Sequence, residues 1–210
     1  MRKRITFEKG RLLKFTSALD MQSIWQRSLK RADLNIEYSQ GFHPQPKIQS
    51  AVPLPLGFTG RNEIIDIWFA NEYTNSEIKC KLIDSLPDGI KTKSIVNVTD
   101  NHKALTGLAQ FADYKIHLLS DGVDGKNLAN SIDLLLGHVS IIRERNNKKY
   151  DLRSLIISIK SQTDLHNQIN IEMRLLTKPS HTGRPDEVIK ELGLKLENCE
   201  IERTKVYFEE

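Results

Sequence analysis

Tyr38–Gly57 reads YSQGFHPQPKIQSAVPLPLG and holds four of the chain's seven prolines. Proline fixes φ and removes a backbone donor, whereas glycine admits positive φ, so we expect an ordered loop without a regular repeat. The stretch also carries Tyr38, Phe42, His43 and Lys47, whose side chains can stack, titrate or bind anions. Such a loop is a typical place for function. The alternative is a structural crossover whose aromatic side chains anchor it to the core.

Outward from this loop, residues 1–99 alternate between short strand patterns and capped helix patterns. The expected elements are a strand at Arg4–Glu8, a helix from the Ser17–Asp20 capping box to about Arg31, strands at Lys47–Leu56 and Glu63–Ala70 joined by a turn at Gly57–Asn62, a helix from Thr74 or Asn75 to Leu86, and a strand at Ile90–Val98. The order β-α-β-β-α-β is the ferredoxin-like one, an antiparallel sheet with two helices on one face.

The second half repeats this plan with one more strand, in the order β-α-β-β-β-α-β. Expected are strands at Asp113–Leu119, Val139–Arg145, Leu152–Ser161, Gln168–Leu176 and Cys199–Phe208, with helices at Asp124–Leu136 and from Pro185 to a stop at Gly193. The predicted fold class is therefore α+β, with two tandem ferredoxin-like halves at residues 1–99 and 112–210. Residues 100–111 are the predicted connector.

Composition is that of a globular chain, with 39% hydrophobic and 28% charged residues among 210. No run of about 18 apolar residues is present, so no membrane span is predicted. The basic start, MRKRITFEKG, is not followed by the apolar core of a signal peptide, and a cytoplasmic protein is expected. Cys80 and Cys199 are far apart, which predicts neither a disulfide nor a thiolate metal site, and we expect both to be buried.

Positive charge is concentrated at the start of the chain. Residues 1–60 hold 10 Lys or Arg against 4 Asp or Glu, whereas the rest hold 21 against 23. A basic region favours an anionic partner such as a phosphate backbone; a solvated surface without a ligand is the alternative.

Three cations, Arg27, Lys30 and Arg31, cluster near the end of the first predicted helix. They can complement the helix dipole or form a phosphate-binding face beside the Tyr38–Gly57 loop. Arg184 precedes the predicted helix at Pro185, whose free N–H groups could take an anion. An ordinary capped helix start is the alternative there.

Motifs for several kinds of chemistry are missing. None of the six histidines has metal-ligand spacing, and the chain has no GxxxxGK[ST], GxGxxG or GxSxG, so no metal or cofactor is expected. Asp66 lies in an apolar strand pattern, and we expect an arginine partner for it. Asp151 is expected to cap a turn, and Arg153 to bind a carboxylate.

Several segments together resemble one family, the radical-SAM-linked proteins of bacteria. They are Phe7–Lys9, FTSALD at 15–20, RSLKRA at 27–32, YSQGFHP at 38–44, PLPLG at 53–57, Glu63–Asp66, DLR at 151–153, GRPDEV at 183–188, and Arg203-Thr204. The resemblance implies an accessory protein of a radical SAM enzyme with a B12-binding-type domain, encoded nearby. The chain lacks the CxxxCxxC motif that holds the [4Fe–4S] cluster of a radical SAM enzyme. It has Ala18 where the family usually has histidine, which weakens any catalytic pairing with His43.

Three functions follow as hypotheses. The first is a non-catalytic accessory protein that binds RNA or another polyanion, with phosphates on cations and bases on aromatic rings. Its expected binding residues are Arg27, Lys30, Arg31, Tyr38, Phe42, His43, Lys47 and Arg184. The second is a docking module for the radical SAM partner, through the loop and its edge strand. The third is a metal-independent RNA endonuclease that uses His43. The oligomeric state stays open.

Overall fold

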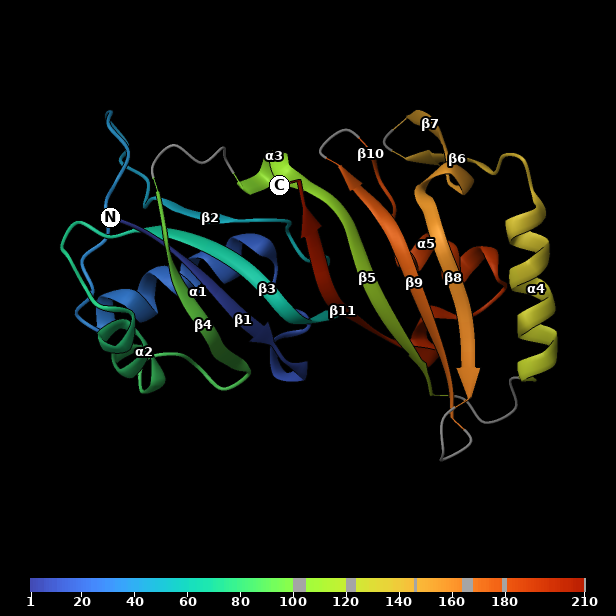
Figure 1. Cartoon of the computed structure of the whole chain (residues 1–210), viewed down its shortest axis with the longest axis horizontal. Helices are drawn as coiled ribbons and strands as arrows, with labels where there is room; N and C mark the ends of the chain where they lie inside the picture. The colour runs from blue at the N-terminus through green and yellow to red at the C-terminus, as the bar shows by residue number, and fades with distance from the viewer. Residues whose placement is uncertain (100–104, 120–123, 146, 164–167, 179–180, 210) are drawn as a thin grey trace. The chain divides into compact units, whose positions relative to one another are not determined.

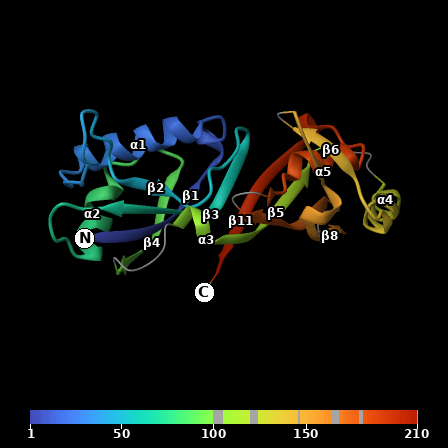
Figure 2. The same ribbon diagram turned by 90° about the horizontal axis from the view of Figure 1, so that it is seen from above.

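The computed structural model describes residues 1–99, 105–119, 124–145, 147–163, 168–178 and 181–209. It has a mixed α+β fold in which the sheet pairing is mostly antiparallel (Figures 1 and 2). The chain divides into two compact units, Met1–Ala109 and Gln110–Glu210. Among the helices within the described ranges, none is both long enough and apolar enough to cross a lipid bilayer.

Unit 1 is a four-stranded antiparallel sheet in the order β2-β3-β1-β4. Its elements are β1 (Arg2–Lys9), η1 (Arg11–Leu13), α1 (Ala18–Arg31), β2 (Ile48–Ser50), β3 (Phe58–Trp68), α2 (Asn75–Ile83), β4 (Ile90–Val98) and α3 (Leu105–Leu108). In the central pairs, Ile5 lies opposite both Ile65 and Ile95. These three buried side chains define the face of the sheet that carries the core.

Both long helices of unit 1 cover this same face, because their buried side chains join the same cluster as those of the strands. Trp25 of α1 meets Phe7 of β1 edge to face, with ring centroids 5.0 Å apart, and α2 contributes Ile78 and Leu82. Figure 2 shows α1 lying along the strands of this unit. Burial of one apolar stripe per helix accounts for this arrangement.

Capping boxes fix where the two helices begin, as the sequence predicts. Ser17 Oγ accepts from the backbone N–H of Asp20, whose carboxylate accepts in return from the N–H of Ser17. Thr74 and Glu77 do the same for α2. Each box satisfies two backbone donors that would otherwise lack a partner.

The predicted arginine partner of Asp66 is confirmed, and the carboxylate in fact pairs with two arginines. It lies on the other face of the sheet, fully buried, and accepts from Arg2 Nε at 2.9 Å and Arg4 Nε at 2.9 Å. Because β3 is flanked by β1 and β2, the carboxylate is enclosed.

Two predictions in the loop region are wrong. The strand expected at Lys47–Leu56 is shortened to β2, Ile48–Ser50. The chain leaves the hydrogen-bonded sheet before Pro53, because proline has no N–H to donate to a neighbouring strand. The turn expected at Gly57–Asn62 lies mostly within β3, which begins at Phe58. Leu54 turns inward and is buried.

Unit 2 has β9 paired with β8, β10 and β5, and β5 next to β11. Its elements are β5 (Ala109–Leu118), α4 (Gly125–Gly137), β6 (Ile142–Arg145), β7 (Lys148–Asp151), η2 (Arg153–Leu155), β8 (Ile156–Thr163), β9 (Ile169–Lys178), β10 (His181–Thr182), α5 (Pro185–Glu191), η3 (Leu196–Asn198) and β11 (Cys199–Phe208). The strand expected at Leu152–Ser161 therefore starts four residues late, at Ile156, and pairs with β9.

The β6–β7 hairpin forms a separate two-stranded sheet. Asp151 ends it: its Oδ1 accepts from the N–H of Ile141 at 2.8 Å and of Arg153 at 3.0 Å, which confirms Asp151 as a turn cap. Tyr150 attaches the hairpin to α5 by donating to the Glu187 carboxylate, and burial together with this bond raises the pKa of Tyr150 to about 12.

Other local predictions also differ from the structure. Arg153 donates to main-chain carbonyl oxygens of Leu136 and Ile156, at 3.1 and 3.2 Å, and not to a carboxylate. Cys80 lies on the solvent side of α2 and is exposed, and Cys199 is partly exposed. Of the predicted connector, residues 100–104 lie outside the described residues, and residues 105–111 form α3 and the start of β5.

Candidate functional site

A groove of about 620 Å³ runs along the second half of α1 in unit 1. It is lined by Gln26, Arg27, Lys30, Asp33, Leu34, Asn35, Ile36 and Tyr38. Arg27 and Lys30 are three residues apart and so share one face of the helix. The volume is in the range of about 300–1,000 Å³ that is typical of small-molecule sites.

The end of α1 builds the second wall of the groove. Asp33 has a φ of 51°, in the left-handed region, and two backbone bonds close the helix around it: Asp33 N–H to the Lys30 carbonyl at 3.2 Å, and Leu34 N–H to the Leu29 carbonyl at 3.0 Å. This is a Schellman motif. It reverses the chain so that Leu34 is buried and the residues up to Tyr38 return beside the helix.

Contacts with the sheet then hold this returning segment. The hydroxyl of Tyr73 accepts from the backbone N–H of Asn35 at 3.1 Å, Ile36 pairs with Phe69, and Tyr38 pairs with Pro46. The wall is therefore ordered without a ligand. This ordering reduces the entropy cost of binding.

Beyond Tyr38, the predicted loop is a compact hairpin. Ser39 N–H donates to the Gln45 carbonyl at 2.8 Å, and Gln45 N–H donates to Ser39 Oγ at 2.9 Å. Phe42 and His43 lie at its tip, and both are exposed, Phe42 completely. The aromatic side chains thus do not anchor the loop to the core, and the crossover interpretation holds only for its base.

The structure brings together only part of the predicted binding set. Arg27, Lys30 and Tyr38 line one groove. Arg31 instead donates to the main-chain carbonyl of Ser85. Lys47 Nζ lies 2.7 Å from Glu37 and lowers the pKa of that carboxyl.

Three remaining candidates lie elsewhere. Phe42 and His43 do not line the groove, and neither does Ala18, the first residue of α1. Across the described ranges, the His43 ring makes no hydrogen bond, and Lys47 is engaged by Glu37. Arg184 belongs to unit 2, where its guanidinium makes two bonds of 2.9 Å to Asp186.

Four of the ten cations in residues 1–60 are used inside the fold. Arg2 and Arg4 pair with Asp66. Lys3 is buried and donates to the side-chain oxygens of Asn75 and Asn97, and buried Lys9 donates to the Thr16 carbonyl. These four do not contribute to a phosphate-binding surface, so the argument for an anionic ligand rests on the groove.

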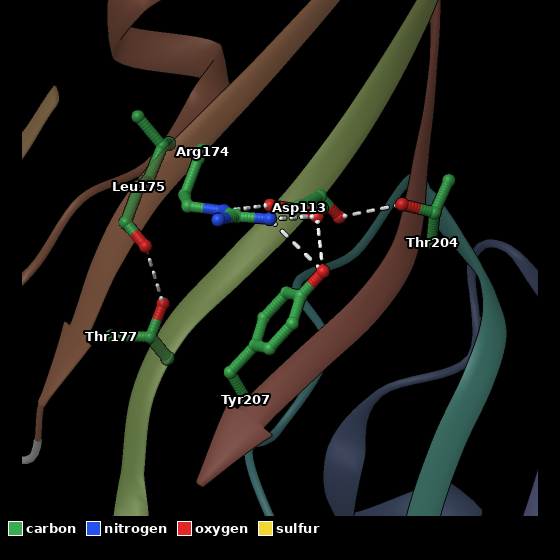
Figure 3. A network of polar contacts seen from close by, with 6 residues as sticks. All are labelled: Asp113, Arg174, Leu175, Thr177, Thr204 and Tyr207. Carbon is green, nitrogen blue, oxygen red and sulfur yellow. Dashed lines mark hydrogen bonds and ion pairs between the residues drawn. The ribbon is translucent and has the colours of Figure 1, made fainter. Parts of the chain in front are cut away.

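Unit 2 holds a polar network that sequence reasoning missed (Figure 3). Arg174 of β9 bonds Asp113 of β5 at 2.6 and 2.8 Å, and the Tyr207 hydroxyl of β11 donates to the same carboxylate at 2.9 Å. The Arg174 guanidinium lies 4.5 Å from the Tyr207 ring centre. Partial burial opposes ionisation, but these bonds outweigh it and lower the pKa of Asp113. Both carboxylate oxygens of Asp113 accept hydrogen bonds, and the three side chains come from three strands, so the network links β5, β9 and β11.

Chemically, the groove offers cations for phosphates, a phenol ring for stacking and several hydrogen-bonding groups. Sequence reasoning missed Gln26, Asp33 and Asn35 as lining residues. Asp33 could have been recognised, because Asp and Asn are enriched in the left-handed conformation directly after a helix. Gln26 and Asn35 line the groove only because the chain reverses after α1, and no local sequence pattern indicates this role.

Comparison with known proteins places the chain in a family. A family model described as an uncharacterised protein conserved in bacteria (DUF2344) matches residues 2–185, so the chain belongs to that family. No curated protein sequence matches it.

Solved structures show likeness of fold alone. A chain of the crystal structure of a Cbf5-Nop10-Gar1 complex aligns with a TM-score of 0.52 and 12% identity, over 97% of this chain and 48% of that one. This protein thus spans about half the length of the chain it resembles. A structure assigned to a glycine cleavage system transcriptional repressor aligns over 100% of this chain and 97% of that one, with a TM-score of 0.26 and 10% identity, which is too low to support an argument.

Proposed function

We propose that this protein binds single-stranded RNA, or a similar polyanion, in the groove beside α1 and presents it to a radical SAM enzyme without itself catalysing a reaction. The observation that carries the proposal is the convergence of Arg27, Lys30 and Tyr38 on one groove. Cations that meet phosphates beside an aromatic ring that stacks a base are the usual elements of single-strand recognition. The radical SAM partner rests on the resemblance of the YSQGFHP and PLPLG segments to radical-SAM-linked proteins.

The arrangement of each unit supports a finer fold proposal, two tandem ferredoxin-like halves. Unit 1 has the element order β1-α1-β2-β3-α2-β4 with the sheet order β2-β3-β1-β4. Leaving out the β6–β7 hairpin and the short β10, unit 2 has β5-α4-β8-β9-α5-β11 with the order β8-β9-β5-β11. The two sequences of elements and strands correspond one to one.

Salt dependence tests the binding proposal. A fluorescent single-stranded RNA is titrated with the full chain at several KCl concentrations. Each phosphate contact contributes about −0.7 to the slope of log K against log salt, so Arg27→Gln and Lys30→Gln should each make the slope less negative by about that amount. Tyr38→Leu should weaken binding by roughly tenfold with an unchanged slope.

Lys47→Gln is the matched control, because Lys47 is equally exposed but paired with Glu37. It should leave affinity and slope unchanged. Absence of salt-sensitive binding, or an equal effect of all three cation variants, would overturn the proposal.

A docking module without RNA is the second candidate, and complete exposure of Phe42 at the tip of an ordered hairpin favours it. Leu54, which lies in the strand expected to dock the partner, is buried and unsuitable as a probe. Co-purification with the radical SAM protein that survives nuclease and is lost with Phe42→Ser would support docking. Persistence of the complex with Phe42→Ser would remove this role for the tip.

A further inference from the structure

A weakly paired carboxylate belongs to a residue that lines the groove. The Asp33 side chain is 92% exposed and forms a long ion pair with Lys81, whose Nζ lies 3.9 Å from Oδ2. Other carboxylates of unit 1 are engaged more closely, for example Asp66 by two arginines and Glu37 by Lys47. The Asp33 carboxylate can therefore accept further hydrogen bonds, and Asp33 lines the same groove as Tyr38, Arg27 and Lys30.

Such a carboxylate repels phosphate, so a ligand that fits the groove needs hydrogen-bond donors at the end opposite its phosphate. An ionised carboxylate only accepts, through two oxygens, and it bonds best to two adjacent donors. Among the RNA bases, guanine alone presents two neighbouring donors on its Watson–Crick edge, N1–H and the 2-amino group. Adenine and cytosine pair a donor with an acceptor, and uracil has a single donor between two acceptors.

We propose that the groove is a guanine-nucleotide site, in which Asp33 accepts from N1–H and the 2-amino group, Tyr38 stacks on the base, and Arg27 and Lys30 bind the phosphate. The Asn35 amide, in the same wall, supplies a donor for O6. This inference rests on the proposed function and adds base selectivity to it. It also gives a role to the left-handed conformation of Asp33, which ends α1 at the wall of the groove.

Isothermal titration with 5′-nucleotides tests the inference on the full chain. A bidentate base contact discriminates by about 5- to 150-fold, so wild type should bind GMP at least tenfold more tightly than AMP and several-fold more tightly than IMP, which lacks the 2-amino group. Asp33→Asn should reverse the preference in favour of XMP, because xanthine keeps N1–H but has an oxygen at position 2 that accepts from the new amide.

Asparagine tolerates the left-handed conformation, so Asp33→Asn should keep the fold. Asp84→Asn, at an exposed position that does not line the groove, is the matched control and should keep GMP selectivity. The same comparison of affinities is made with oligouridines that carry one central guanosine, inosine or adenosine. Base selectivity can then be measured even if mononucleotides bind weakly.

The outcomes separate the two proposals. Equal binding of guanosine and adenosine RNA, together with weakened binding by Arg27→Gln and Lys30→Gln, would overturn guanine selectivity and leave RNA binding intact. Retention of GMP preference by Asp33→Asn would also overturn it. Failure of the protein to bind any RNA or nucleotide at low salt would overturn both the RNA-binding proposal and the guanine-site proposal.

Discussion

Removing the Asp66 carboxylate should destabilise unit 1 more than any exposed charge change. Asp66 is fully buried and accepts from both Arg2 and Arg4. The Arg2 side chain is only 3% exposed, so Asp66→Ala would remove the carboxylate that neutralises a guanidinium held away from water, whereas Arg4 at 25% can rehydrate. Breaking a buried pair in this way costs about 3–5 kcal/mol, a large part of the roughly 5–15 kcal/mol that holds a domain together.

Urea unfolding followed by tryptophan fluorescence measures this unit by itself. The chain has two tryptophans, Trp25 and Trp68, and both lie in unit 1. With a slope of about 1.5 kcal/mol per M, the midpoint should fall by about 2 M or more.

The control in the same unit is Glu37→Gln, whose partner Lys47 is exposed. Exposed pairs contribute about 0–1 kcal/mol, so its midpoint should barely move. Asp66→Leu combined with Arg2→Met should recover part of the loss, because apolar replacement of a buried pair is nearly neutral. A midpoint for Asp66→Ala within the error of wild type would refute the assignment of a buried, stabilising pair.

Two further outcomes follow from the structure. Hydrogen bonds lower the folded-state pKa of Asp113, so its contribution to stability is present above the unfolded pKa of about 4 and is lost as pH falls through the folded value. Asp113→Asn should therefore flatten the loss of stability below about pH 4, measured by circular dichroism, and an unchanged acid dependence would contradict this. A Cβ on Gly60 would lie 2.3 Å from Oε1 of buried Glu63, so Gly60→Ala should lower the free energy of unfolding by about 1–3 kcal/mol. A Cβ on Gly137 meets no atom within 4 Å, so Gly137→Ala should not have this cost. Equal melting temperatures for the two variants would contradict the clash.

Local patterns predicted much of the regular structure. The Ser17 and Thr74 capping boxes fixed the starts of α1 and α2, and alternation predicted β4 and β11 with the bounds that the structure has. These features depend on residues within three or four positions of one another. Strand partners were harder to predict, because they depend on residues distant in the sequence: β6 pairs with β7, whereas β8 pairs with β9.

By itself, the sequence determined the strand and helix periodicity, the cap of the first helix, an ordered loop after Tyr38 and the need of Asp66 for a cation. Only the tertiary structure decided which cations remain available. Arg2, Lys3 and Lys9 are enclosed and Arg31 is bound to a carbonyl, whereas Arg27 and Lys30 face a groove. A charge count treats all of these groups alike, but the energy of a charge depends on its burial and its partner, and both are set by residues far away in the chain.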